Sequence, residues 1–230
     1  MAGHLIPGGQ QIRDDRGAAD PRVTAALAAY QAGQGSEQAA LTALAATRLL
    51  VPVIAVLAAG TAGREQGDKD SEMVLPTLIG RDGRPAVLAF TSLDALARWR
   101  PEARPVPAEA DRVWRAAVAD GCAVGIDVAG PVPLAVEGAR LAALAAGHPV
   151  PPPHDDPDVQ AEVQAAVAAE PVIAGFSLAP GRPGATDLAI RLELAKPSPD
   201  REPAVNRAAA GIAARLGARL HRGIEVIIAE

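Results

Sequence analysis

The sequence predicts an α+β protein in which short helices cover two small mixed or antiparallel sheets. Short apolar runs rich in β-branched residues occur between segments with helical spacing, which is typical of this class. The 230 residues suffice for one large domain or two small ones. Alanine accounts for 53 residues and aromatic residues for only 2%, so we expect a core of Ala, Val, Leu and Ile.

The first third of the chain predicts a tail, two helices and three strands. Residues 1–21 have no apolar period and predict a mobile tail. Asp20 followed by Pro21 is typical of a helix start, and Ser36 is typical of a second one. The strands that we expect next form the antiparallel centre of this half, at 49–57, 72–79 and 85–90.

Helices and strands then alternate up to residue 146. Thr91 to Asp94 resembles a capping box, with Asp in place of the usual Glu or Gln, and predicts a helix start. Gly121 is typical of a helix end. The spacing predicts an extended segment at 104–107, helices at 108–120 and 137–146, and strands at 122–128 and 131–136.

A proline-rich segment predicts a domain boundary. Five of the eleven residues in 147–157 are proline, which is typical of an extended linker. We therefore expect a first domain over 22–147, a linker over 148–157 and a second domain over 158–230. The second domain is expected to contain, in order, a helix at 158–170, strands at 172–178 and 186–195, a helix at 203–220 and a strand at 224–229. With a strand at Val150, this order is β-α-β-β-α-β, the ferredoxin-like arrangement.

Charge and composition exclude several classes of function. The net charge is −5 and no basic stripe occurs, so we expect no nucleic-acid partner. The apolar run over 49–60 contains Pro52 and is too short to span a membrane. A single cysteine, Cys122, fits a reducing compartment, and the first residues have no signal-peptide pattern. These features predict a cytoplasmic protein.

The usual catalytic motifs are absent from the sequence. His148 and His154 precede Asp155, Asp156 and Asp158, but standard zinc and calcium spacings do not occur, so a solvated linker is favoured over a metal site. Cys122 has no basic neighbour in sequence and is expected to be a small buried hydrophobe. We expect no catalytic residue, cofactor or metal, which favours a protein that is not an enzyme.

One loop is dense in functional groups. Its residues lie between two predicted strands, and a rigid scaffold that presents a polar loop is a common way to build a site. A charged loop that is only solvated is the alternative. The residues of this predicted interaction or ligand surface are Arg64, Lys69, Asp70, Ser71 and Glu72.

Several segments resemble a known family. The segments 70–84, 90–99 and 104–107, with Asp127 and the later Gly130-Pro131, are similar to the N-terminal domain of the SseB family, named for an enhanced-serine-sensitivity phenotype. Two later segments, 172–178 and 223–228, are similar to the family's smaller C-terminal domain. The resemblance implies a fold and supplies no reaction, cofactor or catalytic residue.

Two hypotheses about function follow. The first is a non-catalytic interaction or binding module, which meets a protein partner or a second copy of itself through a sheet edge or an apolar helix face. The alternative is an enzyme or ligand-binding regulator connected with amino-acid (serine) metabolism, as the family's name suggests. The alternative requires a pocket around residues 69–72.

Overall fold

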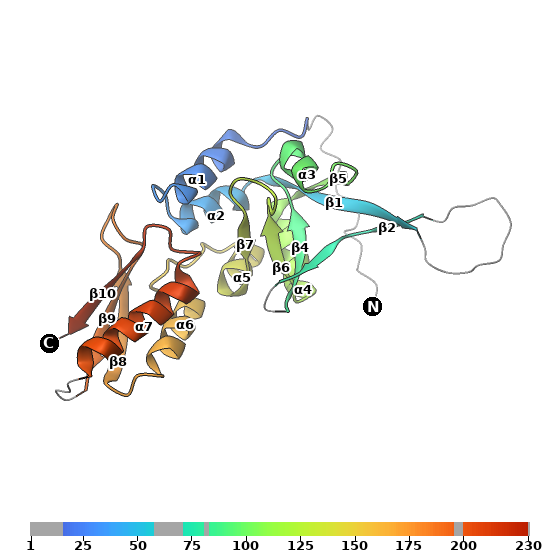
Figure 1. Cartoon of the computed structure of the whole chain (residues 1–230). Coiled ribbons are helices and arrows are strands. Elements are labelled where there is room, and N and C mark those ends of the chain that lie inside the picture. The colour runs from blue at the N-terminus through green and yellow to red at the C-terminus, as the bar shows by residue number, and fades with distance from the viewer. Residues whose placement is uncertain (1–15, 58–70, 81–82, 196–199, 230) are drawn as a thin grey trace, which may run out of the picture. The chain divides into compact units, whose positions relative to one another are not determined.

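A computed structural model describes residues 16–57, 71–80, 83–195 and 200–229 (Figure 1). The described residues form helices together with mixed and antiparallel sheets, so the predicted α+β class is confirmed. They form three small sheets where the sequence predicted two.

The chain folds into two compact units. The first contains 1–24, 44–137 and 144–147, and the second contains 25–43, 138–143 and 148–230. The predicted domain boundary therefore differs from these units, because it assigns 25–43 and 138–143 to the first domain. The predicted linker, 148–157, belongs to the second unit, in which Val150 and Asp156 are buried.

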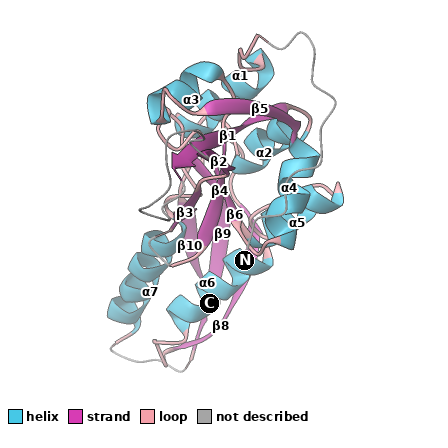
Figure 2. Cartoon of the chain, turned by 90° about the vertical axis from the view of Figure 1, so that its right-hand side faces the viewer, coloured by secondary structure: helices cyan, strands magenta, loops and turns pink. Residues whose placement is uncertain are grey.

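The first unit contains two sheets. One has the strand order β2-β1-β5 and is antiparallel. Its strands are β1 (Arg48–Leu57), β2 (Ser71–Val74) and β5 (Arg104–Glu109). The other has the order β3-β4-β6-β7, and Figure 2 labels its first three strands. Its strands are β3 (Thr77–Ile79), β4 (Pro85–Ala89), β6 (Ala123–Ile126) and β7 (Leu134–Val136).

The expected antiparallel pairings of 72–79 with 49–57 and with 85–90 are present, but the prediction that they form one centre is wrong, because they lie in two sheets. The strand expected over 72–79 breaks at Leu75 and Pro76, where the backbone lacks one donor, and its halves join different sheets. β1 meets the β4 segment only at an isolated bridge between Leu50 and Phe90. β4 instead pairs in parallel with β6, because helices and a strand form a crossover between them.

Two helices of the first unit follow from local sequence. α3 (Leu93–Trp99) begins where the Ser92 side chain accepts a hydrogen bond from the Ala95 N–H. Thr91 is therefore not the cap that the capping-box pattern suggested. α4 (Ala110–Ala119) buries Val113, Trp114 and Ala117 on one face and packs against β4 and β6.

The remaining helices of the first 150 residues begin close to the predicted positions. α1 (Pro21–Gln31) follows Asp20, whose carboxylate accepts a hydrogen bond from the Arg22 N–H at 2.8 Å. α2 (Glu37–Ala45) follows Ser36, whose hydroxyl accepts one from the Ala39 N–H at 3.1 Å. α5 (Gly138–Ala146) closes this part of the chain.

The second unit contains one sheet with the order β10-β9-β8. Val150 is buried but lies in no strand, so the order is α-β-β-α-β and the first strand of the predicted ferredoxin-like arrangement is missing. Side chains of the helices and of the middle strand form its core, with Ile190, Leu192 and Ile212 at most 1% exposed. The elements are α6 (Pro157–Val167), β8 (Ile173–Pro180), β9 (Leu188–Leu194), α7 (Arg201–Leu216) and β10 (Ile224–Ala229).

Candidate interaction surface

The predicted loop site falls mostly outside the described residues. Arg64, Lys69 and Asp70 are outside them, and Ser71 and Glu72 form the start of β2. In the backbone register, Ser71 lies opposite Leu57 and Glu72 lies opposite Val56. The loop therefore stays a prediction, and the site described below rests on other residues.

The histidines and carboxylates of the proline-rich segment have separate roles. The His154 ring lies 3.6 Å from the Asp155 carboxylate, and His148 is exposed. Asp156 caps α6, and Asp158 accepts a hydrogen bond from the Ala139 N–H at 2.8 Å. Within the described residues, no three His, Cys, Asp or Glu side chains gather closely enough to hold a metal ion.

Cys122 follows the end of α4 and is partly buried. Burial raises the pKa of its thiol, and the nearby Asp120 carboxylate raises it further. A higher pKa leaves less of the reactive thiolate at neutral pH. Cys122 therefore has the character of a thiol rather than that of an activated nucleophile.

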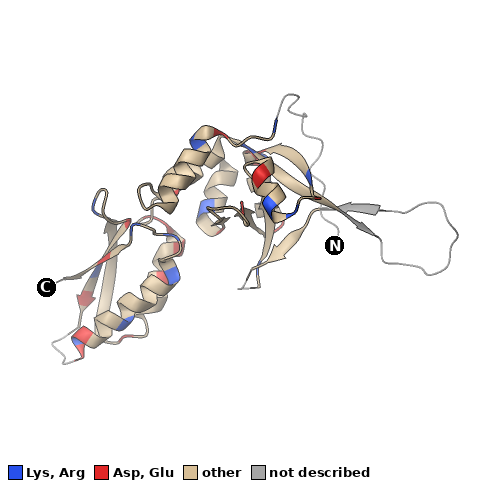
Figure 3. Ribbon diagram, turned by 45° about the horizontal axis from the view of Figure 1, so that its top comes forward, with Lys and Arg blue, Asp and Glu red and all other residues tan. Residues whose placement is uncertain are grey.

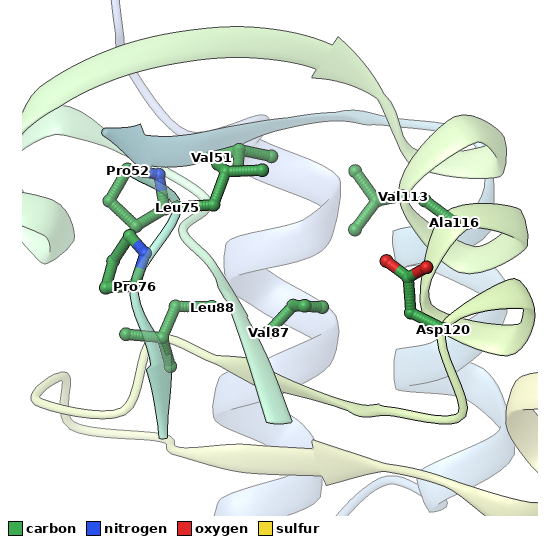
Figure 4. Close-up of a pocket in the computed structure, with 9 residues that line it drawn as sticks. All are labelled: Val51, Pro52, Leu75, Pro76, Val87, Leu88, Val113, Ala116 and Asp120. Carbon is green, nitrogen blue, oxygen red and sulfur yellow. The ribbon is translucent and has the colours of Figure 1, made fainter. Parts of the chain in front are cut away.

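An apolar pocket opens in the first unit between β1, β4 and α4 (Figure 4). Its cavity has a volume of about 40 Å³, close to the share of one water in the liquid. Among the described residues that line the pocket, Asp120 is the charged one. The described residues that line the pocket are Val51, Pro52, Leu75, Pro76, Val87, Leu88, Val113, Ala116 and Asp120.

The pocket continues onto an uncovered part of the sheet face. Val87, which lines the pocket, lies directly opposite Thr77 on the edge strand β3, and Pro85 lies opposite Ile79. Residues opposite each other or two apart along a strand share a face, so Ile79 lies on the same face as Val87. α4 packs on β4 and β6, and Ile79 remains 68% exposed.

We call this area the β3–α4 surface and define it by Thr77, Ile79, Pro85, Val87, Ala116 and Asp120. The sequence prediction missed it because it treats the segment 72–79 as one continuous apolar strand. Pro76 was the available signal, since proline within a strand indicates an edge or a break. The fold then brings α4 beside the strand that follows the break.

Asp127 joins the ends of the two parallel strands of the same unit. Its carboxylate accepts hydrogen bonds from the Thr91 N–H at 2.8 Å and from the Thr91 hydroxyl at 2.6 Å. Its φ is +46°, in the left-handed region that Asp and Asn tolerate better than most residues. Burial raises its pKa, although the bonds from Thr91 act to lower it. With both carboxylate oxygens occupied by Thr91, Asp127 holds β4 and β6 together at this end.

The second unit contains a buried cluster of charged side chains. Arg219 donates hydrogen bonds to Asp156 at 2.7 Å and to Glu37 at 3.1 Å, and Arg140 forms an ion pair with Glu37. Glu37, Arg140 and Asp156 are at most 5% exposed. Burial acts to lower the pKa of Arg219, but the two carboxylates more than offset it, so the pKa is raised. The two arginines balance the charge of the two carboxylates, as is expected of buried charges with a structural role.

Tyr30 and His221 extend this cluster. The Tyr30 hydroxyl donates to the Arg219 carbonyl oxygen at 2.9 Å, and the two rings stack with centroids 4.2 Å apart. Burial, and to a lesser degree Glu37, raise the pKa of Tyr30 far above its ordinary value. The hydroxyl therefore stays protonated and acts as a donor at physiological pH.

Basic and acidic residues are interspersed along the described ribbon (Figure 3). Along α7, for example, Glu202 lies near Arg201, and Arg207 pairs with Glu170 at 2.7 Å. Within the parts of the chain that the structure describes, every helix is too short or too polar to cross a bilayer.

Comparison with known proteins gives one match. The family model described as the SseB protein N-terminal domain matches residues 23–143, more than half of the chain. No curated protein and no solved structure matches the chain.

Proposed function

This chain belongs to the SseB family, and we propose that it is a cytoplasmic, non-catalytic module that binds a protein partner or a second copy of itself through the β3–α4 surface. The single observation that carries the proposal is the uncovered apolar face beside the pocket, where Ile79 is 68% exposed. Large apolar side chains that lie exposed beside an apolar pocket, with a polar rim, are typical of an interaction site.

The chemistry of the surface supports binding more than catalysis. The described residues that line the pocket are almost wholly aliphatic side chains and proline, and among them no two groups could exchange a proton. Asp120, the charged group among the described lining residues, is exposed to solvent. The single cysteine fits the reducing conditions of the cytoplasm.

Two variants of neighbouring residues test the proposal. Leu78 and Ile79 are adjacent in β3 and both are exposed, but consecutive residues of a strand lie on opposite faces of the sheet. Ile79→Glu places a charge on the β3–α4 surface, and Leu78→Glu places the same charge on the other face. Both carboxylates reach solvent, so we expect both variants to fold.

The measurement is affinity isolation from the native cells, combined with the mass of the purified protein in solution. We expect a specific partner, or a concentration-dependent dimer, with the wild-type chain and with Leu78→Glu, and at least about a tenfold loss with Ile79→Glu, because a buried apolar anchor contributes more than 1 kcal/mol. A wild-type protein that stays monomeric and retains no specific partner would contradict the proposal. Equal loss in both variants would also contradict it.

A further inference from the structure

The edge of β3 offers little to an added strand. The strand has three residues, and Pro76 immediately before it has no N–H to donate. The Gly80 N–H donates to the Arg84 carbonyl oxygen at 2.8 Å, so the alternation of an antiparallel pair directs the amides of Thr77 and Ile79 toward the open edge. A short edge with two outward amides supports few hydrogen bonds to a strand laid beside it.

The pocket lies between β4, α4 and β1, whose Val51 and Pro52 also line it, rather than at the open edge of β3. Val87 comes from the second strand, and Ala116 and Asp120 come from α4, one helical turn apart (Figure 4). Helices lie about 10 Å from a neighbouring helix, and strands lie about 4.8 Å apart. One helix therefore covers about two strands, and α4 already packs on β4 and β6 and also contacts β1. A second helix beside α4 would cover β3 and the near side of β4, where Ile79 and Val87 lie.

Asp120 gives this surface a charge preference. It is the C-cap residue of α4, and a carboxylate there adds to the negative end of the helix dipole. Its side chain is exposed, and no ion pair is found for it among the described residues. A cation placed beside Asp120 would be attracted by both the carboxylate and the helix end.

We propose that the β3–α4 surface binds an amphipathic α-helix of a protein partner, with one aliphatic side chain in the pocket and a Lys or Arg beside Asp120. The inference rests on the proposed function and names the kind of partner. The aliphatic lining selects an apolar side chain, and the cavity of about 40 Å³ admits only its end. Asp120 selects against helices that present an acidic residue at the same position.

Two synthetic helical peptides test the charge preference on the full chain. They have the same leucine stripe at i, i+3, i+4 and i+7 and differ in one flanking residue, Lys or Glu. Binding to uniformly labelled protein is followed by NMR at low salt. We expect the Lys peptide to bind the wild type about fivefold more tightly, the size of one exposed ion pair, and to shift the amides of Ile79, Val87 and Ala116. Asp120→Lys should reverse the preference, and Ile79→Glu should weaken both peptides, whereas Leu78→Glu should not.

Several results would overturn the helix inference. One is equal affinity for the two peptides, and another is a set of shifted amides that lies elsewhere. A natural partner that depends on Ile79 but slows hydrogen exchange at the Thr77 and Ile79 amides would indicate strand addition. Such a result would leave the proposed interaction function standing and would contradict the helix. A dimer that depends on Ile79 but binds neither peptide would also contradict the helix and leave the proposed interaction function standing. If no complex of this chain depends on Ile79, the proposed function itself is contradicted.

Discussion

Asp127 combines three features that are seldom found in one residue. It is buried, its φ is positive, and its carboxylate accepts both the N–H and the hydroxyl of Thr91. Asn shares its tolerance of the left-handed region and can still accept from the Thr91 N–H, while its amide donates to the hydroxyl. Alanine can do neither. The residue type is therefore explained by the backbone and by the hydrogen bonds together.

We expect Asp127→Ala to lower the free energy of unfolding by about 2–4 kcal/mol, because a buried N–H loses its acceptor and alanine is strained at a positive φ. We expect Asp127→Asn to cost less than about 1 kcal/mol at neutral pH. Urea unfolding measures both. Equal costs for the two variants would show that Asp127 does not hold Thr91 in this way.

The same residue predicts a pH dependence. Its pKa is raised in the folded protein, so the unfolded chain releases this proton at a lower pH than the folded chain does. The contribution of Asp127 to stability is therefore fully present below the unfolded pKa, about 4, and is lost as the pH rises through the folded value. Unfolding of the wild type and Asp127→Asn at several pH values should show the wild type losing stability relative to the variant over this range.

At the scale of elements, the two arginines near the end of α7 differ in their surroundings. Arg215 pairs with Glu162 on the surface at 2.8 Å, and both side chains are nearly half exposed. Arg219 is 17% exposed and lies between the buried carboxylates of Glu37 and Asp156. The ion pair of Arg215 with Glu162 is weakened by solvent, whereas removal of Arg219 leaves the buried Asp156 without its ion-pair partner and leaves Glu37 with Arg140 alone.

We therefore expect Arg219→Met to lower the free energy of unfolding by about 3–5 kcal/mol and Arg215→Met to lower it by less than about 1 kcal/mol. Thermal and urea unfolding of the two variants measure this difference, and the second variant controls for the loss of an arginine at this end of α7. Similar small effects would mean that the cluster around Arg219 adds little to stability.

At the scale of the whole molecule, the second unit depends on chain segments that are distant in sequence. Glu37 from α2 and Arg140 from α5 belong to it, together with residues 148–230. Gln38 also donates to the Val150 carbonyl oxygen at 2.8 Å within this unit. The predicted domain 158–230 lacks Glu37, Gln38, Arg140 and Val150, so its independence can be tested.

We expect a fragment of residues 158–230 to melt about 10 °C or more below the full chain, because Arg219 loses Glu37 and Asp156 and α6 loses its N-cap. Circular dichroism on heating measures the midpoint. A fragment that melts at the same temperature as the full chain would instead support the domain boundary predicted at 158.

How much could be predicted from the sequence depends on the range of the interactions involved. Helices such as α1, α2 and α3 begin at or next to short polar side chains and proline that act within one turn, so the sequence located these starts closely. The strand expected over 72–79 failed, because its apolar pattern did not reveal that Pro76 separates two sheets. The β3–α4 surface depends on that break and on α4, which begins 34 residues after Pro76, so local patterns could not locate it.

The sequence by itself determined the class of the protein, the type of most elements and the caps of several helices. These properties follow from side-chain spacing and from hydrogen bonds between residues a few positions apart. Only the tertiary structure decided that β4 pairs in parallel with β6, that Thr91 binds Asp127 and not its own helix, and that Arg219 is buried while Arg215 is not. The physical reason is that pairing, burial and exposure depend on which distant segments come together. The energies of those contacts cannot be deduced from the side-chain spacing within any one segment.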